Sequence, residues 1–248
     1  MKAMILAAGL GTRLKPWTLS HPKALVPVAG VPMLERVIRR LFDFGFDEIT
    51  VNVHHFSDQI VDFLADNSFG ARISISDESD LLLDTGGSLL KAAPLIFADD
   101  TPCLIHNVDI LSDAPLDRLL QRHLESGRDI SLVCSPRDSS RRLIFDESGR
   151  LAGWHNLNSD EYRPAGFTPA DGMREVAFSG IYFVGRSILP TLQSYSNQVD
   201  SPKFPVMDFF LSSLDRLNIG VLWLDDLHLI DIGKPDTLRQ ANAIGSSL

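Results

Sequence analysis

One stretch decides the fold: Lys2-Ala3-Met4-Ile5-Leu6-Ala7-Ala8-Gly9-Leu10-Gly11-Thr12-Arg13-Leu14. Residues 2–6 read as an apolar strand that runs directly into a turn of small residues. Because alanines and glycines leave no bulk over this turn, a nucleotide can lie on the backbone, with N–H groups facing its oxygens. Arg13 and, further along, Lys23 supply the fixed positive charge that a triphosphate requires. Arginine clamps phosphate oxygens in pairs, whereas lysine acts as a compact point charge.

Two better-known glycine motifs do not fit this stretch. A dinucleotide-binding fingerprint needs G-x-G-x-x-G, but Leu14 stands where the third glycine would follow Gly9 and Gly11. A P-loop needs G-x-x-x-x-G-K-S/T, and the sequence contains no such run. A nicotinamide-dependent dehydrogenase would therefore rest on Gly9 and Gly11 alone.

The same region carries a family resemblance. The runs LAAGLGTRLKPWT (6–18) and PKALVPVAGVPMLE (22–35) resemble the signature of the sugar-1-phosphate nucleotidyltransferases, LAAGxGTRLxPLT followed by PKPLxPVxGxPxLE. Trp17 replaces the usual Leu and Ala24 the usual Pro, and neither change removes a phosphate ligand. The resemblance implies a Rossmann-like α/β fold, in which a mixed, mostly parallel sheet is flanked by helices.

Composition narrows the class of protein. The 248 residues carry a net charge of −9, which argues against a surface for nucleic acid or for an anionic membrane. No stretch approaches the roughly 18 apolar residues of a membrane span. Cys103 and Cys134 lie in apolar runs, where buried free thiols are expected. We expect a cytoplasmic chain forming a single domain over 1–248, with a nucleotide-binding half at about 1–112 and a sugar-binding half at about 113–248.

The order of elements agrees with this fold class. Apolar residues at helical spacing over 34–42 predict an amphipathic helix that ends near Gly45. Residues 48–53 and 71–76 read as strands, with a helix over 56–65 between them. Strands that alternate with helices pair in parallel through right-handed crossovers.

A second glycine segment, Asp84-Thr85-Gly86-Gly87, precedes a helix that continues toward Ala93. Asp84 or Thr85 can cap this helix, and glycines in its first turn would let a flat ring approach the backbone. The alternative is an ordinary loop of turn residues. The segment resembles the part of the family that holds the nucleobase and ribose. The nucleotide-binding residues that the resemblance implies are Leu6, Ala7, Ala8, Gly9, Gly11, Thr12, Asp84, Thr85, Gly86 and Gly87.

Two aspartates are predicted as metal ligands. Residues 102–106 read as a buried strand that ends in Asn107-Val108-Asp109, and an acidic residue at a strand tip suits Mg²⁺ beside phosphates. The segment resembles the family's NGD metal motif, with Val108 in place of Gly. Asp231, in Asp231-Ile232-Gly233, resembles the family's second metal ligand at the end of another strand.

The sugar side departs from the family pattern. After a predicted hairpin of residues 142–145 and 150–155, many relatives carry Glu-Lys-Pro, but this chain has Trp154-His155-Asn156 there and a predicted loop over 158–172. Ser179 and Gly180 resemble the family's FSGI segment beside the sugar. Lys203 precedes a helix, as in relatives whose lysine reaches the sugar phosphate. The sugar-phosphate contacts that follow from the resemblance are Asn107, Ser179, Gly180 and Lys203.

The resemblance implies that a sugar 1-phosphate attacks an NTP, GTP or UTP, with Mg²⁺, to give an NDP-sugar and pyrophosphate. Arg13 and Lys23 are the expected catalytic residues, because alignment and charge neutralisation suffice for an anionic nucleophile. Short relatives include mannose-1-phosphate guanylyltransferases, heptose-1-phosphate nucleotidyltransferases and N-acetylmuramate-1-phosphate uridylyltransferases. A catalytically silent regulatory protein of the same fold is the alternative, and a homodimer is left open.

Overall fold

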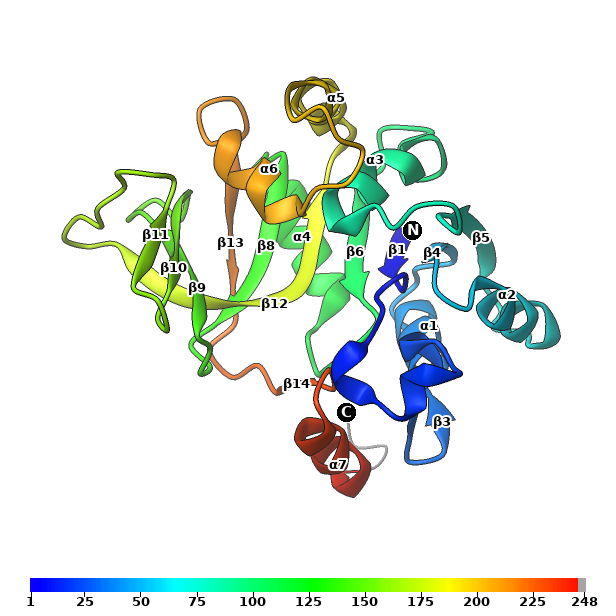
Figure 1. The fold of residues 1–248 in the computed structure, drawn as a ribbon. Coiled ribbons are helices and arrows are strands. Elements are labelled where there is room, and N and C mark those ends of the chain that lie inside the picture. Colours follow the sequence, from blue (N-terminus) through cyan, green and yellow to red (C-terminus); the bar gives the residue numbers. More distant parts are fainter. Residues whose placement is uncertain (245–248) are drawn as a thin grey trace.

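A mixed sheet forms the centre of the molecule in this computed structural model, which describes residues 1–244 (Figure 1). Helices cover both of its faces. The strands are β1 (Lys2–Leu6), β2 (Pro27–Val28), β3 (Val31–Pro32), β4 (Glu48–Val53), β5 (Arg72–Asp77), β6 (Cys103–Asn107), β7 (Ile110–Ser112), β8 (Ile130–Ser135), β9 (Arg141–Phe145), β10 (Leu151–Asn156), β11 (Glu161–Arg163), β12 (Arg174–Val184), β13 (Ile219–Trp223) and β14 (Leu229–Asp231). The helices are α1 (Met33–Asp43), α2 (Ser57–Asp66), α3 (Asp84–Ile96), α4 (Leu116–Ser126), α5 (Leu189–Gln198), α6 (Val206–Ser212) and α7 (Pro235–Ile244), with short 3₁₀ helices η1 (Thr12–Leu14), η2 (Trp17–Leu19), η3 (Lys23–Leu25) and η4 (Arg186–Ile188).

The first half of the sheet is parallel, in the order β6-β1-β4-β5. Leu6 at the end of β1 pairs with Asn52 of β4 on one side and with Asn107 of β6 on the other. The carboxyl ends of the three strands are therefore level at one edge of the sheet. In open α/β sheets this is the edge where ligands bind. The predicted parallel pairing of residues 2–6, 48–53 and 71–76 is confirmed.

The second half of the sheet changes direction. β12 runs antiparallel to β6, to β8 and to β9, and the β9-β10-β11 ribbon extends the sheet away from the parallel strands (Figure 1). The register of β12 against β8 shifts between Phe178 and Tyr182, and Gly180 in this bulge has φ +77°. Glycine tolerates that backbone angle without steric strain. The predicted fold class, a mixed sheet flanked by helices, is confirmed, and the parallel pairing that was predicted for most of the sheet is confined, within residues 1–244, to β6-β1-β4-β5 and to β8 with β13.

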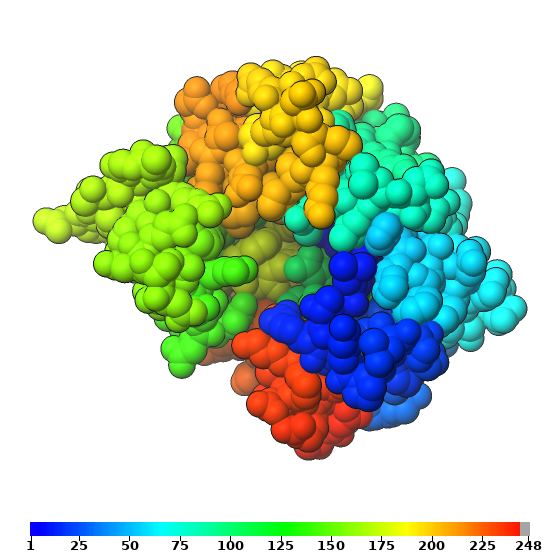
Figure 2. Space-filling model, in the orientation of Figure 1, coloured from blue at the N-terminus to red at the C-terminus, as the bar shows by residue number. Residues whose placement is uncertain are grey.

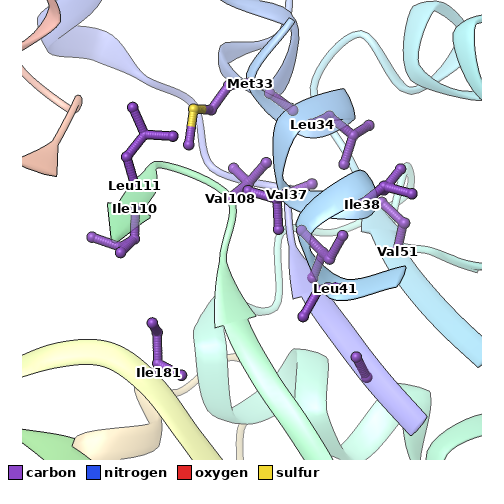
Figure 3. Packing of buried hydrophobic residues seen from close by; sticks show 14 of the residues in the cluster. Met33, Leu34, Val37, Ile38, Leu41, Val51, Val108, Ile110, Leu111 and Ile181 are labelled. Atoms are coloured by element: carbon purple, nitrogen blue, oxygen red, sulfur yellow. The ribbon is translucent and has the colours of Figure 1, made fainter. Parts of the chain in front are cut away.

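Helix α1 shows how the apolar pattern builds the core. Its Leu34, Val37, Ile38 and Leu41 are at most 3% exposed and point toward the sheet, where they meet β4 residues such as Val51 (Figure 3). Each such side chain contributes about 1.5–3 kcal/mol when it leaves water. The amphipathic helix predicted over residues 34–42 is confirmed.

The predicted loop over residues 158–172 is wrong in part, because it contains the short strand β11. Trp154 of β10 pairs with Arg163 of β11, and the rings of His155 and Tyr162 stack at 3.9 Å. These contacts join residues of two different segments. The polar composition of 158–172 does not reveal them, since cross-strand packing, and not local pattern, creates the strand.

The prediction that Asp84 or Thr85 caps helix α3 is confirmed only in part. α3 begins at Asp84, and Leu83 before it makes no capping hydrogen bond, but Asp84 Oδ1 accepts a hydrogen bond from the Thr85 N–H group, at 2.6 Å, in the first turn. The hydroxyl of Thr85 instead accepts a hydrogen bond from the N–H group of Val206, at 2.9 Å, where α6 begins. Thr85 therefore ties the start of α6 to the start of α3.

Two expectations concern the chain as a whole. Cys103 and Cys134 are buried and free, as predicted. Within residues 1–244, none of the helices has the length and apolar character needed to span a membrane.

Candidate active site

The loop after β1 is fixed to the sheet by Asn52. The Oδ1 atom of Asn52 accepts hydrogen bonds from the N–H groups of Ala7 (2.6 Å) and Ala8 (3.3 Å). These two N–H groups, which the sequence predicted to face a nucleotide, hold the loop to β4. A Cβ atom placed on Gly9 would meet nothing within 4 Å, so the open part of the loop begins at Gly9.

Gly11 has a different role from Gly9. It has φ +61°, and a Cβ atom at this position would lie 2.8 Å from the Cβ atom of Lys23. Glycine is therefore required both for the turn and for the close approach of Lys23. The Thr18 hydroxyl also donates a hydrogen bond to the Gly11 carbonyl, at 3.0 Å. This packing brings Lys23 to the edge of the sheet.

A buried polar network, which the sequence analysis missed, supports Asn52 from behind. The carboxylate of Glu78 is fully buried and accepts hydrogen bonds from Asn52 Nδ2 and from Ser88 Oγ, both at 2.9 Å. A buried carboxylate is costly unless it is hydrogen-bonded, so Glu78 depends on Asn52 and Ser88 to stay buried. The polar Asn52 within the apolar strand 48–53 was the signal that would have revealed the network.

Two adjoining cavities open at this edge of the sheet. Figure 2 shows a hollow in this face, bordered by the N-terminal loops, the β9–β11 ribbon and the segment around α6. The first cavity, of about 280 Å³, is lined by Leu6, Ala8, Gly9, Lys23, Asn52, Leu82, Asp84, Thr85, Ser88, Asn107, Val108 and Asp109. The second, of about 590 Å³, is lined by Leu6, Thr85, Asn107, Ser139, Arg141, Arg142, Leu143, Trp154, Arg163, Phe178, Tyr182, Pro205, Val206, Met207 and Asp208.

The two cavities share Leu6, Thr85 and Asn107, so they form one continuous cleft. This cleft contains many of the residues predicted from the sequence. Those that line it are Leu6, Ala8, Gly9, Lys23, Asp84, Thr85, Asn107 and Asp109. Those outside the two linings are Ala7, Gly11, Thr12, Arg13, Gly86, Gly87, Ser179, Gly180, Lys203 and Asp231.

A cluster of charges lies at the first cavity, where Lys23 and Asp109 line its wall. Lys23 Nζ forms an ion pair with Asp109 Oδ2, and both side chains are largely buried. β14 pairs antiparallel with β7, and Asp231 lies opposite Ile110, the residue that follows Asp109. A Cβ atom on Gly233 would lie 2.7 Å from both Arg13 Nη2 and Asp231 Oδ1, so Arg13 also belongs to this cluster.

The two aspartates form a donor set suited to Mg²⁺. The β7–β14 ladder brings them together, with the Ile232 N–H group donating to the Asp109 carbonyl at 2.9 Å. No group of three or more His, Cys, Asp or Glu side chains with metal-binding geometry occurs within the part of the chain that the structure describes. Mg²⁺ needs only one or two carboxylates, because phosphate oxygens and waters complete its shell. Asp109 and Asp231 thus have the chemistry that this ion prefers, and their binding of Mg²⁺ stays a prediction.

Arg137 is a further charged residue at the same edge, and the sequence analysis missed it. Its Nη2 donates to the carbonyl of Phe178 at 2.8 Å, beside the β12 bulge. Burial lowers the pKa of the Arg137 guanidinium, and the nearby carboxylate of Asp231 opposes this shift. This half-buried cation adds positive charge near Asp231.

The glycines at 86 and 87 pack against protein. The Phe204 carbonyl accepts hydrogen bonds from the N–H groups of Gly86 (2.9 Å) and Gly87 (3.3 Å). A Cβ atom on Gly86 would lie 2.9 Å from the Phe204 carbonyl oxygen, and one on Gly87 would clash with the Pro202 carbonyl. These glycines thus admit the segment 202–204, and a contact with a nucleobase stays a prediction for them.

The predicted sugar-phosphate residues are only partly brought together. Ser179 is buried, and its hydroxyl accepts a hydrogen bond from the Ile181 N–H group at 3.2 Å. A Cβ atom on Gly180 would lie 2.7 Å from Asn107 Nδ2, so the bulge packs directly behind Asn107. Lys203 is exposed and lies outside both linings. In this structure Asn107 is the one of the four that faces the cleft.

Comparisons with known proteins were made for the sequence and for the fold. Residues 2–150 match the family model described as Nucleotidyl transferase. The chain is 31% identical over 231 residues to a mannose-1-phosphate guanyltransferase of Gibberella zeae, covering 91% of this chain and 60% of the relative. It is 28% identical to mannose-1-phosphate guanylyltransferase 1 of Arabidopsis thaliana, covering 83% of this chain and 55% of the relative. The chain therefore spans just over half the length of these relatives.

Solved structures share the fold. HddC from Yersinia pseudotuberculosis superposes with a TM-score of 0.75 at 22% identity, and 98% of each chain is covered. The same protein complexed with GMP-PN gives a TM-score of 0.73 at 21% identity, again with 98% of each chain covered. A putative glucose-1-phosphate thymidylyltransferase from Bacillus anthracis, in complex with a sucrose, gives 0.80 at 18% identity, covering all of this chain and 96% of the other.

Proposed function

Because the chain belongs to the nucleotidyl transferase family, we propose that it transfers a nucleoside monophosphate from an NTP to a sugar 1-phosphate. The products are an NDP-sugar and pyrophosphate. The observation that carries the proposal is the cleft itself. A cavity lined by the small-residue loop and by the ion pair of Lys23 with Asp109 adjoins a second, larger cavity.

The chemistry requires positioning and charge neutralisation. A phosphate oxygen of the sugar 1-phosphate attacks the α-phosphorus of the NTP, and the bond to the pyrophosphate group breaks, so no side chain has to remove a proton. Arg13 stabilises the charge of the departing pyrophosphate, and Lys23 aligns the two phosphates at the junction. Asp109 and Asp231 would hold Mg²⁺, which neutralises charge that develops on the phosphates.

The ion pair of Lys23 with Asp109 bears on this mechanism. The two largely buried charges stabilise each other. A bound phosphate would compete with Asp109 for Lys23, and a bound Mg²⁺ would compete with Lys23 for Asp109. The N–H groups of the loop from Gly9 onward offer donors for phosphate oxygens, as expected for a backbone concavity. The half-buried Arg137 adds positive charge on the side of Asp231.

A guanine nucleotide with mannose 1-phosphate is the substrate pair that we propose first. The support is that the curated relatives are named mannose-1-phosphate guanyltransferases and that one protein of the same fold was solved with GMP-PN. UTP with a different sugar 1-phosphate is the alternative pair.

The test is release of pyrophosphate from the purified protein with Mg²⁺. Each NTP is supplied in turn, with 1-phosphates of mannose, glucose, heptose and N-acetylmuramic acid. Release that requires GTP and mannose 1-phosphate together is the expected result. Release with another pair would correct the substrates and keep the reaction. Binding of an NTP without any turnover across the panel would favour a regulatory protein that has kept the fold.

A further inference from the structure

The larger cavity holds three arginines in unequal environments. Arg141 and Arg142 come from β9 and Arg163 from β11, and Asp208 of α6 lies across from them in the same lining. The family resemblance implies that a lysine contacts the sugar phosphate, but this chain has no Glu-Lys-Pro segment and Lys203 lies outside the cavity. The cation that receives the anionic group of the sugar substrate must therefore be sought among the cavity's own residues.

Arg163 is already occupied by protein partners. Its Nε donates to Glu161 Oε1 at 2.8 Å, and its Nη1 donates to Asp208 Oδ1 at 3.2 Å. Its guanidinium also lies 4.9 Å from the centre of the Trp154 ring, within the range of a cation–π interaction. Arg163 thus fastens β11 to α6 and shapes the wall of the cavity, and its charge is neutralised there.

Arg142 lies in the same lining without such partners. Its side chain is only 21% exposed, yet within residues 1–244 its contact with a carboxylate is a 3.9 Å approach to Asp138, a residue that projects fully into solvent. No side-chain hydrogen bond holds Arg142 among the described residues, so its guanidinium N–H donors are available to an anion in the cavity.

The position of Arg142 connects it to the reaction. Arg142 pairs across the ribbon with His155 of β10 and lines the cavity that shares Asn107 with the nucleotide cavity. If the NTP occupies the first cavity, the anion that binds in this adjoining cavity is the other substrate, the sugar 1-phosphate. We propose that Arg142 binds the phosphate group of the sugar 1-phosphate through its paired N–H donors, in place of the family's lysine. This inference rests on the proposed function and names a residue for one of its substrates.

The experiment compares three variants with the wild type. Arg142→Gln removes the charge, Arg142→Lys keeps the charge without the fork of donors, and Arg118→Gln is a matched control on the exposed part of α4, outside both cavities. Titration calorimetry measures the Kd of mannose 1-phosphate, glucose 1-phosphate and N-acetylmuramate 1-phosphate, and of GTP separately. Thermal unfolding checks that each variant is folded.

The expected result is a rise of about 10-fold to 100-fold in the Kd of every sugar 1-phosphate in Arg142→Gln, with a smaller rise in Arg142→Lys. The Kd of GTP and the control variant should stay at the wild-type values. An unchanged Kd for the sugar 1-phosphates in Arg142→Gln would overturn the assignment. A loss confined to N-acetylmuramate 1-phosphate would also overturn it, because Arg142 would then bind a carboxylate of the sugar.

Calorimetry needs no turnover, so the two proposals fail in different ways. If the wild type binds a sugar 1-phosphate and Arg142→Gln binds it equally well, only the role of Arg142 is wrong. If the wild type binds GTP but none of the sugar 1-phosphates, the proposed reaction fails and the assignment of Arg142 fails with it.

Discussion

The two cavities of the cleft are built from different kinds of elements. The first, the proposed nucleotide side, joins the loop after β1 to the carboxyl ends of the parallel strands β4 and β6 and to the start of α3, and Asn52, supported by Glu78 and Ser88, fixes that loop through hydrogen bonds. The second, the proposed sugar side, is assembled from β9, β10, β11 and β12, which pair in antiparallel ladders, and from α6, which the ion pair of Arg163 with Asp208 ties to β11.

This difference explains which departures from the family pattern the protein tolerates. On the nucleotide side, position 11 and the polar network leave little freedom, because a Cβ atom at Gly11 would meet the side chains of Lys23 and Thr18. On the sugar side, a cation can enter the cavity from any of several strands. A lysine lost from one segment can therefore be replaced by an arginine on another, as we propose for Arg142.

Removal of divalent metal ions should have the largest effect. If Asp109 and Asp231 hold Mg²⁺, excess EDTA should abolish pyrophosphate release, and added Mg²⁺ should restore it. The measurement is the initial rate before and after each addition, at constant ionic strength. A full rate in EDTA would show that the reaction proceeds without a divalent ion, with Arg13 and Lys23 neutralising the phosphate charge.

Loss of either cation of the nucleotide side should come next. Arg13→Ala and Lys23→Ala should each lower kcat by about 10²–10³-fold, as for removal of one preorganised charge. Lys91→Ala, at an exposed position of α3, is the control. Steady-state kinetics with both substrates varied gives kcat and both KM values. Wild-type turnover in Lys23→Ala would remove this residue from the mechanism.

Acid should lower the free energy of unfolding, because His106 and His123 are buried in the folded chain. Burial lowers the pKa of His106, on β6, and of His123, on α4, in each case to about 4. Both imidazoles stay neutral in the folded chain, whereas in the unfolded chain they gain protons below pH about 6.5. The free energy of unfolding should therefore be full above pH about 6.5 and fall as the pH drops toward 4, by about 2–3 kcal/mol per histidine.

Denaturant titrations at several pH values between 4.5 and 7.5 measure this slope. His123→Gln should flatten it, because one of the two groups no longer titrates, whereas the exposed His21→Gln should leave it as it is. Equal slopes in the wild type and in His123→Gln would show that His123 is not the source.

The network behind the nucleotide loop should contribute both stability and affinity. Asn52→Ala removes the acceptor of the Ala7 and Ala8 N–H groups and a donor to the buried Glu78 carboxylate. We expect a loss of about 1–3 kcal/mol in the free energy of unfolding. The KM of the NTP should rise while that of the sugar 1-phosphate stays constant. Asn67→Ala, at an exposed position after α2, is the control. A rise in both KM values would contradict the assignment of Asn52 to the nucleotide side alone.

The contact between β11 and α6 should have the smallest effect. Arg163→Ala removes two partly exposed ion pairs and a cation–π contact with Trp154. Because such pairs contribute little at the surface, we expect at most about 1 kcal/mol in stability and a modest rise in the KM of the sugar 1-phosphate. Thermal unfolding and kinetics together measure it. A rise confined to the KM of the NTP would contradict the placement of Arg163 on the sugar side.

The sequence by itself determined the parallel half of the sheet and the nucleotide side. Helix α1, strands β1, β4 and β5, and the residues Lys23 and Asp109 follow from local apolar periodicity and from motifs whose residues are close in the chain. Local patterns of this kind are set within a few residues, so they can be read without knowing what packs against them.

Only the tertiary structure decided the rest. The ties of Thr85 to α6 and of Gly86 to Phe204, the strand β11, and the placement of Lys203 outside and Arg142 inside the cavity join residues far apart in the sequence. The surroundings of a side chain, and hence whether its charge is compensated, depend on which distant segments meet it. All three residues are arginines, so the sequence cannot tell them apart. In the structure Arg141 is exposed, Arg142 is half-buried and Arg163 is paired with Glu161 and Asp208.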